Sequence, residues 1–365
     1  MNKVKAIAST LCLAATVLNA FGVAAYADTA PAANPATPDP IVEMMKPCSD
    51  GGDPELQAIA CTELITGGRL LGPQLGAAYV FRGKANAARQ QLQAAIADFT
   101  AALKIDGRAA DALYNRGAAH ALVGRYDLAL ADFNKVLELA PSDADTLFYR
   151  ARIYARQGRN AAAIKDLTLV LKAVPNDSDS LDARGQLYVL TGAFDSAIAD
   201  LSALAALLPD SAEVFYNRGR AYFLKGDFAS AAKDFDLARV KRTDNPYAAL
   251  RLYLANARLG KASKPDIKPL EAAMEKYDLG QWPMPIAALT LGKISEQELG
   301  QLTEVKDAAA AAMRACETHY YLGEFALIKG DKAAAKAHFA AVDAKSASLS
   351  IECSDARVAL KGLGG

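Results

Sequence analysis

Histidine is scarce in this sequence, which has three among 365 residues: His120, His319 and His338. No two of them are four residues apart, the spacing that puts two metal ligands on one helix face. His319 and His338 fall on two neighbouring helices expected near the end of the chain, but no third ligand is evident beside them. His120 stands where apolar packing is expected. We therefore predict no metal ligands.

Other motifs that carry chemistry are also missing. The sequence has no Cys-x-x-Cys pair, no glycine-rich phosphate loop that ends in Lys-Ser or Lys-Thr, and no nucleophile elbow. Acidic residues are abundant, but a catalytic carboxylate pair needs a cleft that raises one pKa, and acids on exposed helix positions are usually solvated. We expect no catalytic residues, no cofactor and no enzymatic activity. A hydrolase that uses His319 and His338 is the weakest alternative.

An excess of one charge is absent as well. The 41 basic residues balance the 41 acidic ones, and no long run has a single sign. Proteins that bind nucleic acid carry basic patches that neutralise phosphates. Nucleic acid is therefore excluded as the expected partner.

The first 27 residues have the pattern of a secretory signal. Lys3 and Lys5 precede an apolar run over residues 6–25, which ends in Ala25-Tyr26-Ala27. Small residues at this spacing form a cleavage site. We predict a cleaved signal peptide over residues 1–27, no membrane span in the mature chain, and an extended leader over the Pro- and Ala-rich residues 28–50.

Four cysteines follow the predicted signal peptide: Cys48, Cys61, Cys316 and Cys353. An even number of cysteines in an oxidising compartment indicates disulfides, and three connectivities are compatible with four cysteines. We predict Cys48–Cys61 and Cys316–Cys353. Each of these bonds would staple one end of the fold, where a neighbouring structural unit is missing.

A period of 34 residues organises the middle of the chain. Steps of 34 from Gly117 reach Gly83, Ala151, Gly185 and Gly219, and an arginine precedes each of these residues. A second set of small and large apolar residues recurs in each period, as at Ala129, Phe133 and Val136. Spacings of four and three place each such set on one helix face, so every period encodes a helical hairpin.

These residues resemble the tetratricopeptide repeat, in the variant whose first helix reads Asn-Arg-Gly, as at residues 115–117. The predicted fold is an all-α solenoid of helical hairpins that forms a right-handed superhelix. Its predicted parts are a capping helix within residues 51–72, five hairpins over 73–245, a degenerate helical section over 246–316, and a final hairpin with a tail over 317–365.

The arginine of each period keeps step with an aspartate sixteen residues later. This spacing places the two residues on the facing helices of one hairpin, and a matching acid for every arginine favours a structural role over a ligand track. The predicted ladder of ion pairs consists of Arg82–Asp98, Arg116–Asp132, Arg150–Asp166, Arg184–Asp200 and Arg218–Asp234.

In tetratricopeptide repeats the first helices line the concave surface, and this resemblance assigns a groove for a partner segment. The aromatic and basic residues at the inward positions are Lys84, Tyr114, Phe148, Arg152, Arg156, Tyr216 and Arg220, whereas the fourth hairpin has Asp182 and Gln186 there. Such a groove suits a protein or peptide segment that carries acidic residues. The alternative, that the aromatic residues only pack between hairpins, is equally compatible with the pattern.

The second half of the chain resembles the bacterial lipoprotein NlpI family. The likeness rests on residues 253–255, 281–283, 291–297 and 321–323 with 329–331. Members of that family are periplasmic, outer-membrane-associated adaptors that dimerise and bring a tail-specific protease together with peptidoglycan endopeptidases. This chain lacks their lipid attachment box.

The resemblance implies a non-catalytic periplasmic adaptor for an envelope protease or peptidoglycan hydrolase. It also allows a homodimer and a peripheral association with the outer membrane. The alternative is a structural subunit of a secretion or polysaccharide-export assembly.

Overall fold

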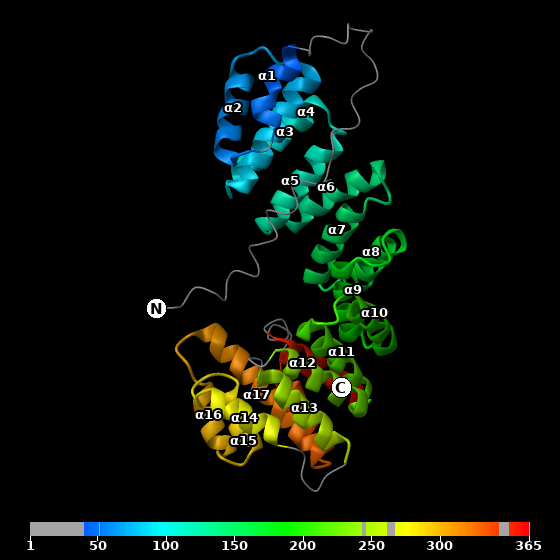
Figure 1. Cartoon of the computed structure of the whole chain (residues 1–365), viewed down its shortest axis with the longest axis vertical. Coiled ribbons are helices and arrows are strands. Elements are labelled where there is room, and N and C mark those ends of the chain that lie inside the picture. The colour runs from blue at the N-terminus through cyan, green and yellow to red at the C-terminus, as the bar shows by residue number, and fades with distance from the viewer. Residues whose placement is uncertain (1–39, 51, 243–245, 261–266, 343–349, 365) are drawn as a thin grey trace. The chain divides into compact units, whose positions relative to one another are not determined.

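The computed structural model describes residues 40–50, 52–242, 246–260, 267–342 and 350–364, and these residues form helices and their connections without strands (Figure 1). The predicted signal peptide, residues 1–27, lies outside them. The chain divides into two compact units, with the boundary between Gln157 and Gly158. This division falls inside the predicted array of five hairpins, and each unit is described by itself below.

The first unit consists of seven helices in the described residues. They are α1 (Pro40–Ser49), α2 (Pro54–Thr66), α3 (Gly72–Ala88), α4 (Leu92–Ile105), α5 (Ala110–Leu122), α6 (Tyr126–Leu139) and α7 (Ala144–Arg156). Helices α3 and α4 form one antiparallel hairpin and α5 and α6 form the next, and α4 also packs against α5. The predicted capping helix is α2, which begins after the N-cap Asp53.

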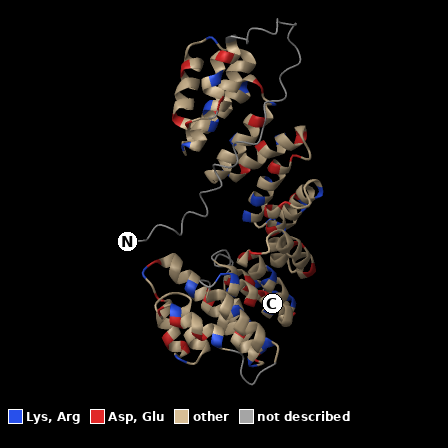
Figure 2. Ribbon diagram, viewed as in Figure 1, with Lys and Arg blue, Asp and Glu red and all other residues tan. Residues whose placement is uncertain are grey.

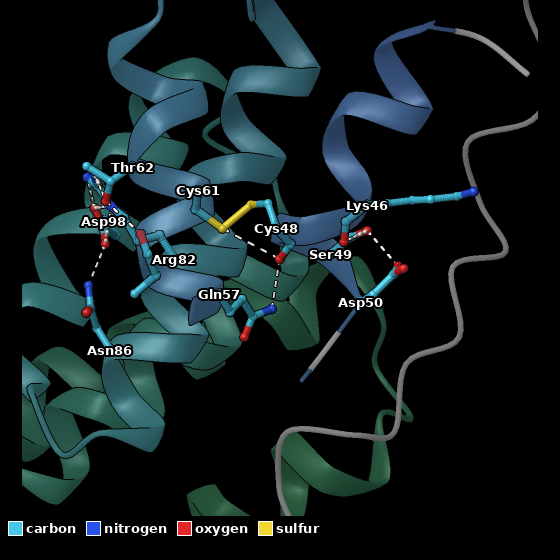
Figure 3. Close-up of a disulfide and its surroundings, with 11 residues drawn as sticks. Lys46, Cys48, Ser49, Asp50, Gln57, Cys61, Thr62, Arg82, Asn86 and Asp98 are labelled. Carbon is cyan, nitrogen blue, oxygen red and sulfur yellow. Dashed lines mark hydrogen bonds and ion pairs between the residues drawn. A yellow bond between two sulfur atoms is a disulfide. The ribbon is translucent and has the colours of Figure 1, made fainter. Parts of the chain in front are cut away.

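Helix α1 corrects the prediction of an extended leader at residues 40–49, and the rest of that predicted leader, residues 28–39, lies outside the described residues. Pro40 starts the helix, where a missing backbone N–H costs no hydrogen bond. Cys48 of α1 is bonded to Cys61 of α2, and the side-chain amide of Gln57 donates a 2.8 Å hydrogen bond to the carbonyl of Cys48 (Figure 3). These contacts with α2 stabilise a proline-rich segment as a helix.

The repeated glycines allow the two helices of a hairpin to approach closely. A Cβ atom at Gly117 would lie 2.9 Å from Cε1 of Phe133, and a Cβ atom at Gly83 would lie 2.6 Å from the same atom of Phe99. Both phenylalanines are fully buried. Each aromatic ring thus occupies the space that a larger residue in the first helix would need.

The second unit consists of twelve helices in the described residues. They are α8 (Asn160–Ala173), α9 (Ser178–Thr191), α10 (Phe194–Leu207), α11 (Ala212–Lys225), α12 (Phe228–Lys241), α13 (Pro246–Arg258), α14 (Lys268–Lys276), α15 (Met284–Thr290), α16 (Glu296–Thr303), α17 (Ala308–Ile328), α18 (Lys332–Ala340) and α19 (Ile351–Gly362). One continuous apolar core joins the repeat helices from α8 onward to α17, α18 and α19.

The end of the chain differs from its prediction in two respects. The final hairpin begins at Ala308 instead of residue 317, and the predicted tail forms α19. The hydroxyl of Ser350 caps this last helix by accepting a hydrogen bond from the backbone N–H of Cys353, which is disulfide-bonded to Cys316 of α17. Within the described residues, no helix combines the length and apolarity needed to cross a membrane.

Candidate partner-binding surface

Four arginines of the predicted ladder meet their aspartates. In α5, Arg116 donates hydrogen bonds from Nε and Nη2 to the two carboxylate oxygens of Asp132, at 2.9 and 2.8 Å. The closest nitrogen–oxygen distances of the other three pairs are 2.6 Å for Arg82–Asp98, 2.7 Å for Arg184–Asp200 and 2.7 Å for Arg218–Asp234. Arg150 and Asp166 belong to different units, and their pairing stays a prediction.

Each of these arginines also reaches a third helix. Nη1 of Arg116 donates to the Thr100 hydroxyl of α4 at 3.2 Å, and Nη1 of Arg82 donates to the Thr62 hydroxyl of α2 at 3.2 Å (Figure 3). In the second unit the corresponding acceptors are Thr168 for Arg184 and Ser202 for Arg218. The ladder thus joins consecutive hairpins, and its guanidinium groups form their hydrogen bonds within the protein.

The predicted groove residues of α3 and α5 contact the protein itself. Nζ of Lys84 lies 2.7 Å from a carboxylate oxygen of Asp111. Tyr114 is only 6% exposed, with its ring centroid 5.9 Å from that of Phe133 and 6.0 Å from that of Tyr149. Tyr114 is therefore a packing residue, which corrects its assignment to the groove, and burial raises the pKa of its hydroxyl.

The groove residues of α7 remain accessible. Phe148 and Arg152 are half-buried and Arg156 is exposed, at a spacing of four that places them on one helix face. The guanidinium carbon of Arg152 lies 5.8 Å from the ring centroid of Phe148 and 5.9 Å from that of Tyr149. Among the described residues of the first unit, no carboxylate forms an ion pair with either arginine. We call Phe148, Arg152 and Arg156 the α7 surface.

In the second unit, the corresponding residues of α11 are covered by α19. Tyr216 and Arg220 are 7% and 3% exposed. The Tyr216 hydroxyl donates a 2.8 Å hydrogen bond to Glu352, and Nε of Arg220 donates to Asp355. Because their polar groups are already paired inside the chain, neither residue lines an open groove. This corrects their predicted role as free partner-binding residues.

The 34-residue period relates the accessible residues of α7 to the covered residues of α11. Tyr216 and Arg220 of α11 follow Phe148 and Arg152 of α7 by 68 residues, which is two periods. Both pairs thus occupy equivalent places on the first helix of a hairpin. In α11 the arginine binds a carboxylate of a docked helix, whereas in α7 it stacks on aromatic rings.

The structure brings two of the three histidines together. Nδ1 of His319 and Nδ1 of His338 lie 3.2 Å apart, and burial lowers the pKa of His319. Within the described ranges, no group of three or more histidine, cysteine, aspartate or glutamate side chains could hold a metal ion. His120 is buried, and burial lowers its pKa as well. The predicted lack of enzymatic activity stays a prediction.

Three models of the tetratricopeptide repeat match the sequence, at residues 110–143, 133–165 and 183–249. The chain thus carries tetratricopeptide repeats in these stretches, and such repeats bind protein or peptide partners. The narrower likeness to the NlpI family stays a prediction.

Solved structures similar to this chain include other tetratricopeptide repeat proteins. One from Parabacteroides merdae is 16% identical over 81% of this chain and 98% of its own, with a TM-score of 0.49. YrrB, described as having an unusual peptide-binding site, is 23% identical over 52% of this chain and 96% of its own, with a TM-score of 0.47. A third, from Cytophaga hutchinsonii, is 16% identical over 75% of this chain and 97% of its own, with a TM-score of 0.49. Similarity at these sequence identities and TM-scores does not indicate which partner this chain binds.

Proposed function

Because the chain carries tetratricopeptide repeats, we propose that it is a non-catalytic adaptor that binds an acidic segment of a partner protein on the α7 surface. The observation that carries this proposal is the repeat equivalence of Arg152 with Arg220. Arg220 binds a carboxylate of α19, whereas Arg152 has no carboxylate partner among the described residues of the first unit. An acidic side chain of a partner would complete α7 as Asp355 completes α11.

Charge and geometry both favour an acidic partner with an apolar or aromatic anchor. Arg152 and Arg156 add two positive charges one turn apart, and Phe148 offers a half-buried ring beside them. An arginine already held over aromatic rings loses less side-chain freedom when it binds, and partly desolvated arginines and aromatics dominate binding energy at protein interfaces. Basic and acidic residues are interspersed over the rest of each unit (Figure 2).

The cellular setting of the proposal comes from the sequence. The predicted signal peptide supports export to the periplasm, and the resemblance to the NlpI family supports an envelope protease or peptidoglycan hydrolase as the partner. The same resemblance is the ground for proposing a homodimer and peripheral outer-membrane association. A structural subunit of a secretion or polysaccharide-export assembly is the competing function.

A pulldown from an envelope extract tests the proposal, with quantitative mass spectrometry as the readout. The wild-type chain should capture a protease or wall hydrolase, and Phe148→Ala with Arg152→Glu should lower that capture at least about tenfold. Lys135→Glu is the matched control, because it makes the same charge change at an exposed position of α6. Equal capture by all three proteins would reject the α7 surface, and recovery of an outer-membrane assembly instead would favour the competing function.

A further inference from the structure

Helix α19 lies against the first helices of the repeats in the second unit. It packs on α9 and α11, although more than 100 residues separate it from them, and on α17 and α18 of its own hairpin (Figure 1, red). Its first turns carry Glu352 and Asp355, which are three residues apart and so lie on one helix face. Both carboxylates are buried, at 3% and 0% exposure.

The repeat helices supply a matched set of donors for these two carboxylates. Nη2 of Arg251 in α13 donates to Glu352 at 3.0 Å and to Asp355 at 2.8 Å. Arg220 and Tyr216 of α11 add one hydrogen bond to each acid. Two arginines and a tyrosine of α11 and α13 thus bind two acids of a single helix.

This arrangement has the features of ligand recognition by a repeat groove. Buried ion pairs cost desolvation energy and stabilise a fold less than apolar packing of the same volume, whereas they select strongly for a complementary partner. Tyr216 and Arg220 occupy the inward positions at which tetratricopeptide repeats contact their ligands. The docked element is an amphipathic helix that inserts one face between these side chains.

A covalent bond holds α19 in this place. Cys353 immediately follows Glu352 and is bonded to Cys316 of α17, and both cysteines are buried. A tethered ligand has a local concentration in the millimolar range, so an external helix competes poorly with it. Opening the bond would leave α19 attached only by its hydrogen bonds, packing and backbone.

We propose that α9, α11 and α13 form a second recognition site, specific for a helix with carboxylates three residues apart. The chain fills this site with its own α19, and the Cys316–Cys353 bond keeps it filled. A partner helix of the same chemistry binds only where α19 has been released. This site is separate from the α7 surface, and its ligand class follows from a helix already bound in it.

A binding measurement in the full-length chain tests this proposal. The probe is a fluorescent peptide of residues 350–364 with Cys353→Ser, and fluorescence anisotropy is the readout. All proteins carry Arg152→Glu, so that the α7 surface does not contribute to binding. The first protein has no other change, the second adds Cys316→Ser and Cys353→Ser, and the third further adds Glu352→Gln and Asp355→Asn to the resident helix.

The expected affinities rise as the resident helix is weakened. The first protein should not bind the peptide, the second should bind it weakly, and the third should bind it at least tenfold more tightly than the second. A peptide with Glu352→Gln and Asp355→Asn should lose at least tenfold in affinity for the third protein. Because all three proteins carry Arg152→Glu, the result of this test does not depend on the α7 surface. The same chain with Arg152 restored tests the proposed function separately.

Two results would overturn the proposal. One is a folded third protein that does not bind the peptide, and the other is equal binding of the acidic peptide and its amide variant. If the third protein is only marginally stable, the acidic peptide should raise its melting temperature, because a ligand that binds only the folded state stabilises it. The absence of such a rise would also overturn the proposal.

Discussion

The indole Nε1 of Trp282 donates a 2.7 Å hydrogen bond to Oε2 of Glu317, and Trp282 is the only tryptophan in the chain. The Tyr247 hydroxyl donates to the same oxygen at 3.0 Å. Glu317 is 1% exposed, and burial, followed by the nearby Glu352 carboxylate, raises its pKa to about 7. Tryptophan fluorescence should therefore report the ionisation of one buried carboxyl group.

A pH titration of this fluorescence should show a transition with its midpoint at about pH 7, and Glu317→Gln should abolish this transition. The pKa of Glu317 is raised on folding, so its contribution to stability is fully present below the unfolded value of about 4.5 and is lost as the pH rises through about 7. The free energy of unfolding should fall over this window in the wild type and less in the variant. The prediction fails if the fluorescence transition persists unchanged in Glu317→Gln.

The stability contribution of His319 should have the opposite pH dependence. Burial, followed by the proximity of His338, lowers the pKa of His319 in the folded chain. As the pH falls, this histidine is therefore protonated in the unfolded chain before it is protonated in the folded chain. Stability should decrease as the pH falls through about 6.5, the ordinary histidine value. Denaturant unfolding at pH 5 and pH 7.5 measures this difference, which His319→Gln should reduce. An equal difference in the two proteins would assign the effect to other groups.

Removal of a ladder arginine should destabilise the fold much more than removal of the hydroxyl that this arginine binds on a third helix. Arg116→Ala leaves the Asp132 carboxylate, whose side chain is 5% exposed, without its cation, and should cost about 3 kcal/mol of unfolding free energy. Thr100→Val deletes a single hydrogen bond to the same arginine and should cost about 1 kcal/mol. Urea titrations of both variants provide the comparison. Similar losses would show that the ion pair adds nothing beyond one hydrogen bond.

The Cys48–Cys61 bond closes a short loop, with a sequence separation of 13 residues. Cys48→Ser with Cys61→Ser should lower the unfolding free energy by about 3 kcal/mol and expose α1 to proteolysis. Before reduction, alkylation followed by mass measurement should find none of the four cysteines modified. Four alkylated cysteines would refute both disulfides.

Local and periodic features of this structure follow from the sequence. The 34-residue step predicts the positions of the hairpins, and the sixteen-residue spacing predicts the partners of Arg82, Arg116, Arg184 and Arg218, because both depend only on the geometry of one hairpin. The hydroxyl acceptors Thr100, Thr168 and Ser202 also obey the 34-residue step. They could have been predicted by stepping along the second helices for polar residues.

The docking of α19 could not be predicted in this way. Arg220 and Asp355 are 135 residues apart and do not repeat, so no spacing relates them. The predicted groove failed at Tyr216 and Arg220 because the pattern gives their direction on the helix but not what covers them. Helix α1 was missed for a different reason, since its proline content suggested an extended segment and its contacts with α2 lie outside local propensity.

The third contact of the ladder has a consequence for the number of repeats that the chain tolerates. Arg218 binds Ser202 of the preceding hairpin, and Thr168 stands one period earlier as the equivalent acceptor for Arg184. Excision of residues 169–202 would bring Thr168 to the place of Ser202, sixteen residues before Arg218. The junction would close with the same chemistry, so repeats can be lost or duplicated as whole periods without leaving an unsatisfied arginine.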